Sequence, residues 1–233
     1  VSSTGALINL IVNVFMGLSV GTSVVVAQHF GAGRMKDVSE TVHTSVAMAV
    51  VCGIVVGILG FLSAKTMLEW MDSPENVIDL SALYVKIYFI GMPFNMLYNF
   101  GAAVLRAVGD NKRPLYYLTI SGIVNVALNL LFVLVFHMDV AGVALATIIS
   151  QLISAILITA SLMHSESAIK LHLKKIRIHK DKLINIVSVG LPAGIQGSIF
   201  SISNVLIQSS VNFFGDAAMG GSGAGANIEG FMY

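Results

Sequence analysis

Amide and hydroxyl side chains recur at helical spacing inside the long apolar stretches of this sequence. Ser121, Asn125 and Asn129 share one helical face by their four-residue spacing, and Asn95 and Asn99 share another. A third set, interrupted by Phe200, comprises Gln196, Asn204, Gln208 and Asn212. Facing lipid, each amide would cost several kcal/mol, so we expect these side chains to face other helices. They either hydrogen-bond one helix to the next or line a polar, water-accessible cavity, and three aligned sets favour the cavity.

Aromatic and methionine side chains near Asn95 and Asn99 are expected to form apolar walls for such a cavity. They are Tyr84, Tyr88, Met92, Phe94, Met96 and Phe100. Flexible methionines and flat aromatic rings suit greasy or aromatic ligands.

Ionisable side chains at membrane depth are scarce. Glu229 falls in the first turns of a last predicted helix, and a carboxylate at mid-membrane costs roughly 2.5–3.5 kcal/mol. It is either a proton or cation site or a carboxylate near the outer interface. Lys86 and Arg106 lie near predicted helix ends, where long side chains reach the interface.

Six long stretches would carry these groups, and none of the six contains Lys, Arg, Asp or Glu. They are residues 1–33, 41–64, 87–105, 114–136, 140–165 and 183–215. A membrane-spanning helix needs about 20 apolar residues, and each stretch supplies that length. Charged residues make up 11% of the chain and the mean hydropathy is +0.86, against about 25% charged residues in a soluble domain. The sequence therefore predicts an all-α polytopic membrane protein.

Eleven of the 13 Lys and Arg residues fall in alternate gaps between these stretches, and Lys65 and Lys86 are the exceptions. The eleven are Arg34 and Lys36 in the first gap, Arg106, Lys112 and Arg113 in the third, and Lys170, Lys174, Lys175, Arg177, Lys180 and Lys182 in the fifth. By the positive-inside rule these three connections are cytoplasmic. The net charge of +1 thus reflects membrane topology, and we expect no nucleic-acid partner.

The longest connection divides the chain. We predict an N-terminal bundle over 1–164, a basic, partly helical cytoplasmic linker over 165–182, and the start of a second bundle over 183–233. A kink is expected at Pro93 in the third stretch. Close helix packing is indicated by glycines four residues apart, at Gly17 and Gly21, Gly53 and Gly57, and Gly190 and Gly194.

Motifs of soluble enzymes are not found. The glycine-rich residues 221–226 superficially fit a dinucleotide fingerprint, but they follow a predicted membrane span rather than a strand. The six His have no metal-ligand spacing, and the single Cys52 cannot form a disulfide within the chain. We expect neither an enzyme nor a bound cofactor or metal.

Several motifs together resemble the multidrug and toxic compound extrusion (MATE) family. The residues 88–99 (YFIGMPFNMLYN) and 105–114 (LRAVGDNKRP) are similar to its fourth helix and the following loop. The residues 26–33, 140–151 and 190–192 resemble the end of its second helix, its sixth helix and the start of its seventh. The similarity is closest to a bacterial, DNA-damage-inducible-like branch.

The resemblance implies a fold and an activity. Members have two six-helix bundles around a central cavity and export cationic or amphipathic compounds in exchange for H⁺ or Na⁺, by alternating access. On that template the chain is a fragment covering helices two to seven and the start of the eighth, with the first bundle incomplete and the second only begun. The expected setting is the inner membrane of a bacterium, with small-molecule substrates, a lipid bilayer, and a monomer when full length.

The same resemblance assigns roles to individual positions. Asn125 matches the family's fifth-helix Asn and Thr147 its sixth-helix polar residue. Asn129 stands where some members have Asp, and Phe200 where others have Glu. Glu229 resembles an acidic position on the eighth helix. The expected substrate and cation pathway comprises Asn95, Asn99, Asn125, Asn129, Thr147, Gln196, Asn204, Gln208 and Glu229.

Three alternatives remain at this stage. A lipid-linked oligosaccharide flippase of the same superfamily would need a far more cationic cavity, whereas Lys and Arg here lie in the connections. An intramembrane enzyme would need a paired-acid, Ser/Lys or His-metal constellation at bilayer depth. The fragment could also be a scaffold that does not itself transport.

Overall fold

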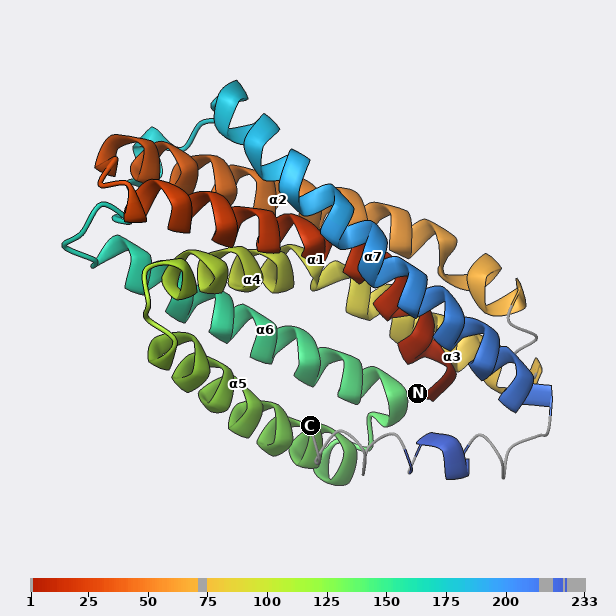
Figure 1. Ribbon diagram of the computed structural model, residues 1–233. Helices are drawn as coiled ribbons and strands as arrows, with labels where there is room; N and C mark the ends of the chain where they lie inside the picture. Colours follow the sequence, from red (N-terminus) through yellow and green to blue (C-terminus); the bar gives the residue numbers. More distant parts are fainter. Residues whose placement is uncertain (1, 71–74, 214–219, 224, 226–233) are drawn as a thin grey trace.

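The computed structural model describes residues 2–70, 75–213, 220–223 and 225, and these form helices joined by short turns and loops, with no strand among them. The elements are α1 (Ser2–Gly31), α2 (Met35–Trp70), α3 (Glu75–Ile90), α4 (Met92–Ala107), α5 (Lys112–Leu130), a π-helical turn (Leu131–Val135), α6 (Asp139–Met163), a 3₁₀ turn (Leu173–Lys175) and α7 (Lys180–Phe213) (Figure 1). The predicted all-α class is confirmed.

Within the described residues, four helices are individually long and apolar enough to cross a membrane. They are Met35–Thr66, Lys112–Val135, Val140–Met163 and Lys180–Val211. The helix α1 adds a rod of 30 residues without a charged side chain, and α3 and α4 together follow the predicted third stretch. The molecule is a multi-pass membrane protein.

The predicted third helix is divided rather than kinked. The helix α3 ends at Ile90 and α4 begins at Met92, with Gly91 between them. Pro93 has no N–H to donate to the Phe89 carbonyl, so the helical ladder is interrupted one turn before the proline. The Gly91 carbonyl restarts it by accepting from the amides of Phe94 and Asn95, both at 3.1 Å. The prediction of one continuous helix was wrong, although the site of the distortion was near Pro93.

Glycine ends α1 and α4 at the basic connections. Gly33 and Gly109 have φ of +70° and +89°, a conformation that side chains with a Cβ rarely adopt. After α4, the Gly109 amide donates to the Arg106 carbonyl and the Asp110 amide to the Leu105 carbonyl, both at 3.0 Å. This glycine-terminated pattern satisfies carbonyls that the helix leaves unpaired. The helix α1 accordingly ends at Gly31, within the residues 26–33 that resemble a helix end in the sequence.

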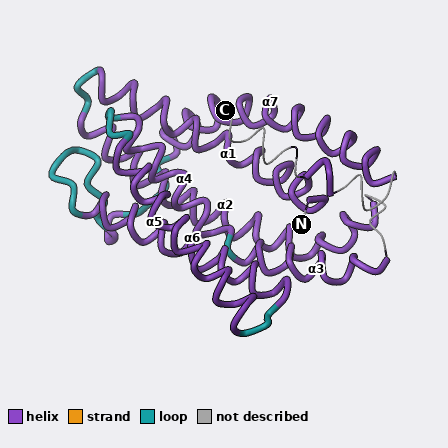
Figure 2. The backbone as a smooth tube through the Cα atoms, turned by 90° about the horizontal axis from the view of Figure 1, so that it is seen from below, coloured by secondary structure: helices purple, strands orange, loops and turns teal. Residues whose placement is uncertain are grey.

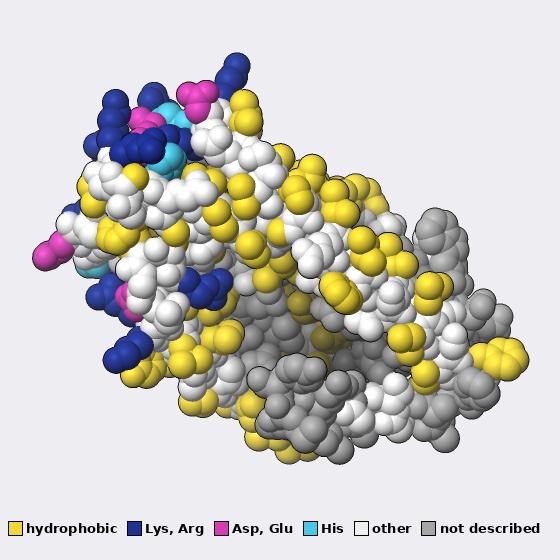
Figure 3. Space-filling view, in the orientation of Figure 1, with side chains coloured by type: hydrophobic (Ala, Val, Ile, Leu, Met, Phe, Trp, Pro, Cys, Tyr) yellow, Lys and Arg dark blue, Asp and Glu magenta, His cyan; other side chains and the backbone are white. Residues whose placement is uncertain are grey.

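All three basic connections lie at one end of the molecule. Figures 1 and 2 show the α1–α2 turn, the α4–α5 turn and the α6–α7 linker together there. In Figure 3, Lys and Arg gather at this end, beside a body covered largely by hydrophobic side chains. The arrangement is the one that the positive-inside rule predicts, and we refer to this end as cytoplasmic. The linker is less helical than predicted, because between Ser165 and His179 only the 3₁₀ turn is helical.

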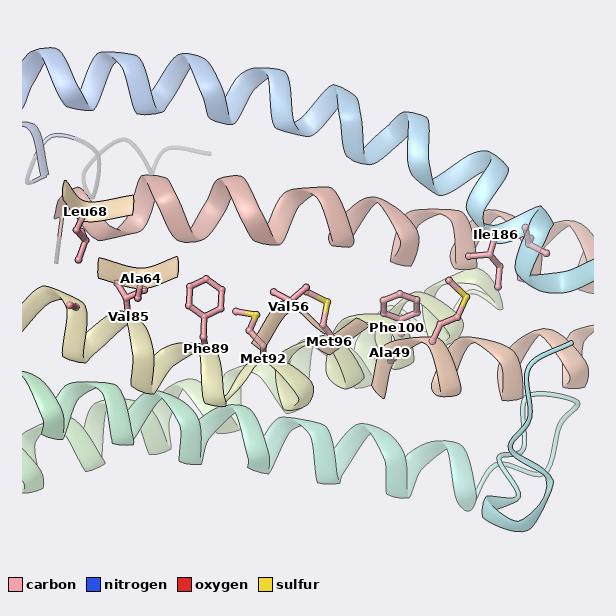
Figure 4. Close-up of a cluster of buried hydrophobic side chains, with 13 residues drawn as sticks. Ala49, Val56, Ala64, Leu68, Val85, Phe89, Met92, Met96, Phe100 and Ile186 are labelled. Atoms are coloured by element: carbon pink, nitrogen blue, oxygen red, sulfur yellow. The ribbon is translucent and has the colours of Figure 1, made fainter. Parts of the chain in front are cut away.

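Buried apolar side chains pack the helices α1, α2, α3, α4 and α7 into one core. Figure 4 shows Phe89, Met92, Met96 and Phe100 in a row along α3 and α4, and all four are at most 1% exposed. The last three are four residues apart, so they share the face of α4 that packs into this core. The expectation that Met92, Met96 and Phe100 line a cavity with the neighbouring amides was wrong, because the amide-bearing face of α4 is a different one.

Glycines bring α7 against α1 at backbone distance. A Cβ on Gly17 would overlap the backbone of Gly194, and one on Gly21 would overlap the backbone of residue 186. Gly57 similarly faces the Phe89 carbonyl, which a Cβ would approach to 2.9 Å. The predicted close packing at the glycine pairs is confirmed, and Figure 1 shows α7 lying along α1.

Replacing Gly190 by Ala is expected to destabilise the α1–α7 contact. The new Cβ would lie 2.7 Å from Leu18 Cα and 2.8 Å from the Gly17 carbonyl oxygen. Overpacking of this kind costs about 1–3 kcal/mol, which a lower midpoint of thermal unfolding in detergent would report. The matched control is Gly122→Ala on α5, where a Cβ meets nothing within 4 Å. Equal midpoints for the two variants would show that the contact is not close.

Candidate functional site

A polar groove runs between α4, α5 and α6. It encloses about 350 Å³ and is lined by Asn95, Tyr98, Leu118, Ser121, Gly122, Asn125, Thr147, Ser150, Gln151 and Ser154. None of these side chains carries a formal charge. In Figure 1, α6 lies between α4 and α5, so each of the three helices contributes one wall.

Hydrogen bonds between amides and hydroxyls join α5 to α6 along the groove. Asn129 Nδ2 donates to Asn125 Oδ1 at 3.0 Å, and Asn125 Nδ2 donates to Ser150 Oγ at 3.3 Å. The Ser150 hydroxyl in turn donates to the Thr147 carbonyl at 2.8 Å. Both interpretations of the amide set on α5 therefore apply, because Asn125 bridges two helices and also lines a cavity.

The α4 wall has its own amide pair. Asn99 Nδ2 donates to the carbonyl of Asn95 at 2.8 Å and to Asn95 Oδ1 at 3.0 Å. Toward the cytoplasmic turn, the Tyr98 hydroxyl donates to the Pro114 carbonyl at 2.9 Å, which ties α4 to the first turn of α5. Asn95 is thereby held with its side chain on the groove while Asn99 supports it from one turn further along α4.

Two acceptor oxygens beside this network have no hydrogen-bond partner. They are Asn129 Oδ1 and Gln151 Oε1, both buried. An unsatisfied buried acceptor costs about 1–3 kcal/mol, which a ligand donor or a cation in the groove would recover. The Gln151 oxygen faces Gly91, where an added Cβ would lie 2.7 Å from it, so the break between α3 and α4 makes room for this side chain. The groove thus offers neutral, oxygen-rich coordination at membrane depth.

The structure gathers part of the predicted pathway. Asn95, Asn125 and Thr147 line the groove, and Asn99 and Asn129 are hydrogen-bonded to residues that do. Whether these residues contact a substrate stays a prediction.

The α7 set lies elsewhere. Gln196 and Asn204 are exposed, as is Phe200 between them, and none of the three lines the groove. The side chain of Gln208 and all of Glu229 lie outside the described residues. The described residues therefore form a polar chamber from two of the three predicted sets.

Three polar lining residues of α6 were missed in the sequence. Thr147 was predicted, but Ser150, Gln151 and Ser154 follow it at intervals of three and four and so share its helical face. That spacing is the signal that could have found them. No group of three or more metal-binding side chains occurs in the part of the chain that the structure describes.

These features define a class: a polytopic helical membrane protein with an uncharged polar groove among its spans. The MatE family model matches residues 1–131, and the chain belongs to that family. It is 31% identical to the "Probable multidrug resistance protein YpnP" of Bacillus subtilis, over 98% of this chain and 51% of that protein. It is 28% identical to the "Probable multidrug resistance protein YoeA" of the same organism, over 100% of this chain and 52% of that protein.

A solved structure supports the fold. The inward-facing conformation of a MATE transporter of the MOP superfamily superposes with a TM-score of 0.85 at 21% identity, over 94% of this chain and 50% of that one. The chain thus spans about half the length of the relatives it matches. With its apolar spans and bacterial relatives, it is a multi-pass protein of a bacterial inner membrane.

Cysteine accessibility tests whether water reaches the groove. In a Cys52→Ala background reconstituted in lipid vesicles, Asn125→Cys and Thr147→Cys are expected to react readily with a charged thiol reagent. Ile123→Cys is the matched control, because Ile123 lies on the same helix as Asn125, is 66% exposed and faces away from the groove. A thiol in lipid ionises poorly and should react far more slowly. Equal labelling at positions 123 and 125 would show that the groove is dry.

Proposed function

We propose that the protein carrying this chain exports cationic or amphipathic small molecules, and that the α4–α5–α6 groove forms part of the substrate pathway. The observation that carries the proposal is an uncharged groove with one buried acceptor oxygen on its wall, Gln151 Oε1, and a second beside it, Asn129 Oδ1, both without a hydrogen-bond donor among the described residues. A substrate ammonium or another N–H donor satisfies such oxygens without requiring a buried carboxylate.

The groove has the size and lining of a ligand site. Its volume of about 350 Å³ lies within the range of roughly 300–1,000 Å³ for small-molecule pockets. Tyr98 supplies an aromatic ring on which a cation or a flat ring can stack. Uncharged walls with several alternative acceptors favour a range of substrates over one. The relatives named as multidrug resistance proteins support this substrate class.

The transport cycle is proposed to be alternating access between two halves. Residues 1–164 would belong to one half and 183–233 to the other, with 165–182 as the joint, as in transporters built from repeated bundles. Substrate and coupling ion would shift the equilibrium between inward- and outward-open states by binding one of them more tightly.

The coupling ion is proposed to be H⁺ or Na⁺, and the described groove bears on the choice. Asn125 and Asn129 do not titrate, so they cannot carry a proton, but their oxygens are hard ligands that suit Na⁺. Proton coupling would need an ionisable group outside the groove, for which Glu229 is the proposed candidate.

Flippase activity on lipid-linked oligosaccharides is the weaker proposal. A pyrophosphate head would need Lys or Arg in the cavity to balance its charge. The groove-lining residues include neither, and the basic residues gather at the cytoplasmic end.

Transport in proteoliposomes tests the proposal. The protein that carries this chain should drive efflux of a cationic dye when a Na⁺ gradient or a pH gradient is imposed, and applying the two separately identifies the coupling ion. If neither gradient drives efflux of any cationic dye, the proposed function is overturned.

Asn125→Ala tests the role of the groove. The change removes the acceptor of Asn129 and the donor to Ser150, so we expect dye efflux to fall about 10-fold or more, since each unpaired polar group costs about 1–3 kcal/mol. Thr119→Ala is the control on the same helix, because Thr119 is exposed and its hydroxyl bonds only the Leu115 carbonyl. Equal efflux by the two variants, at equal amounts of folded protein, would exclude the groove from the pathway.

A further inference from the structure

The α6–α7 linker folds back over the start of α2 and encloses a second, basic cavity. This cavity, which we call the linker pocket, measures about 550 Å³. Its charged and imidazole-bearing walls include Lys36, Glu40 and His43 from α2 and Lys174, Lys175 and Arg177 from the linker. The linker pocket lies at the cytoplasmic end and shares no lining residue with the α4–α5–α6 groove.

Histidine side chains fix the linker in place over α2. His43 Nδ1 donates to the Ser39 carbonyl at 2.7 Å, which leaves Nε2 to accept from the His172 amide at 3.1 Å. The rings of His43 and His172 also stack, with centroids 6.3 Å apart. A second anchor joins the His179 amide to Thr44 Oγ1 at 3.2 Å. The 3₁₀ turn that carries Lys174 and Lys175 is therefore held at both ends, so the pocket is a built feature rather than a loose loop.

The pocket has a surplus of positive charge. Lys36, Lys174, Lys175 and Arg177 face one carboxylate, that of Glu40, and none of the four forms an ion pair among the described residues. Two cations outside the pocket differ in this respect. Lys182 pairs with Asp37 at 2.6 Å and Arg113 with Asp110 at 3.2 Å. The linker pocket therefore gathers four cations around a single carboxylate.

Arginine geometry adds specificity to that charge. Arg177 Nε donates to His179 Nε2 at 3.0 Å, which orients the guanidinium plane. Its terminal nitrogens stay available, and a guanidinium held in this way suits the paired oxygens of a phosphate. The neighbouring lysines would supply point charges to the same group.

The pocket lies at the level where a bilayer presents its headgroups. Apolar spans begin at Met35, end at Met163 and begin again at Lys180, and the pocket residues lie at or between these ends. Figure 3 shows the Lys and Arg cluster bordering the hydrophobic body at this end. The cytoplasmic leaflet carries anionic lipids, and basic pockets between helices on that side suit their headgroups.

We propose that the linker pocket binds a phosphate-bearing anion, and that the headgroup of an anionic phospholipid is its source. Lys174, Lys175 and Arg177 hold the phosphate from the linker and Lys36 from α2. A bound headgroup then bridges the linker to the first turn of α2. The inference is independent of the proposed export function, because it concerns neither the groove nor its substrate.

Lipid titration tests the proposal on the intact chain in neutral detergent. Native mass spectrometry would follow binding of a short-chain phosphatidylglycerol, with a short-chain phosphatidylcholine as the uncharged comparison and inorganic phosphate as competitor. The chain is expected to retain phosphatidylglycerol and not phosphatidylcholine. The variant K174A/K175A/R177A should bind phosphatidylglycerol about 100-fold more weakly, since each cation near a lipid surface contributes about fivefold.

The matched control removes the same charge from the same end. Arg106, Lys112 and Lys170 are exposed cytoplasmic cations that do not line the pocket, and R106A/K112A/K170A should weaken binding less than about fivefold. The charge-conserving variant K174R/K175R, which leaves Arg177 and its bond to His179 in place, should retain binding, and this separates loss of charge from loss of folding. If the two alanine variants weaken phosphatidylglycerol binding equally, or if neither weakens it, the proposal that the linker pocket is the binding site is overturned. Displacement of the lipid by equimolar inorganic phosphate would overturn the lipid assignment and make a soluble phosphate the ligand.

Discussion

Hydrocarbon offers no hydrogen-bond partners, and this constraint decides where every polar side chain of the spans can lie. Short hydroxyls are satisfied by their own helix: Thr41 and Thr44 donate to the carbonyls four residues earlier, at 2.7 and 2.8 Å. Asparagine and glutamine carry both donors and acceptors and cannot be satisfied in that way alone. They need partners on the same or a neighbouring helix, as Asn125 finds in Asn129 and Ser150. The groove forms where such side chains from three helices meet.

Much of the architecture could be predicted from the sequence because lipid imposes simple rules. Stretches without charge mark the spans, groups of Lys and Arg mark the cytoplasmic connections, and glycines such as Gly33 mark helix ends. The spacing of Asn125 and Asn129 likewise identified a shared face. Each of these inferences uses only local spacing or composition, so no knowledge of the neighbouring helices was needed.

The neighbours themselves could not be predicted. Periodicity states that Met92, Met96 and Phe100 share a face, and that Asn95 and Asn99 share another, but not which face meets the core. The same limit applies to α7. Glycines bring α7 against α1 at backbone distance, and Gln196 and Asn204 stay exposed beside that contact, which local spacing alone does not state. The sequence predicted one polar cavity for all three amide sets, whereas in the described residues the α7 set lies apart from the groove.

The attachment of α7 is charged at one end and closely packed along its length. Lys182 is 8% exposed, and its Nζ lies 2.6 Å from Asp37 Oδ1 and 3.4 Å from His29 Nε2. Removing either partner would leave the Lys182 ammonium or the Asp37 carboxylate without its counter-ion at this end of α7. Further along, Gly17 and Gly190 allow the two backbones to touch. Because α1 and α7 belong to different halves in the proposed alternating access, movement of one half against the other must shift or separate this contact.

Charge and polarity are consequently divided by depth. A charged side chain at mid-membrane costs roughly 2.5–3.5 kcal/mol, so most Lys and Arg lie in the cytoplasmic connections, and the polar side chains of the groove are only amides and hydroxyls. Asn129 shows what this division achieves. A carboxylate there would bind a cation strongly but would need a counter-ion when empty, whereas an amide oxygen attracts a cation through its dipole and stays neutral when the cation leaves. A site that must bind and release is better served by the amide, and the missing donor at Asn129 Oδ1 keeps that oxygen available.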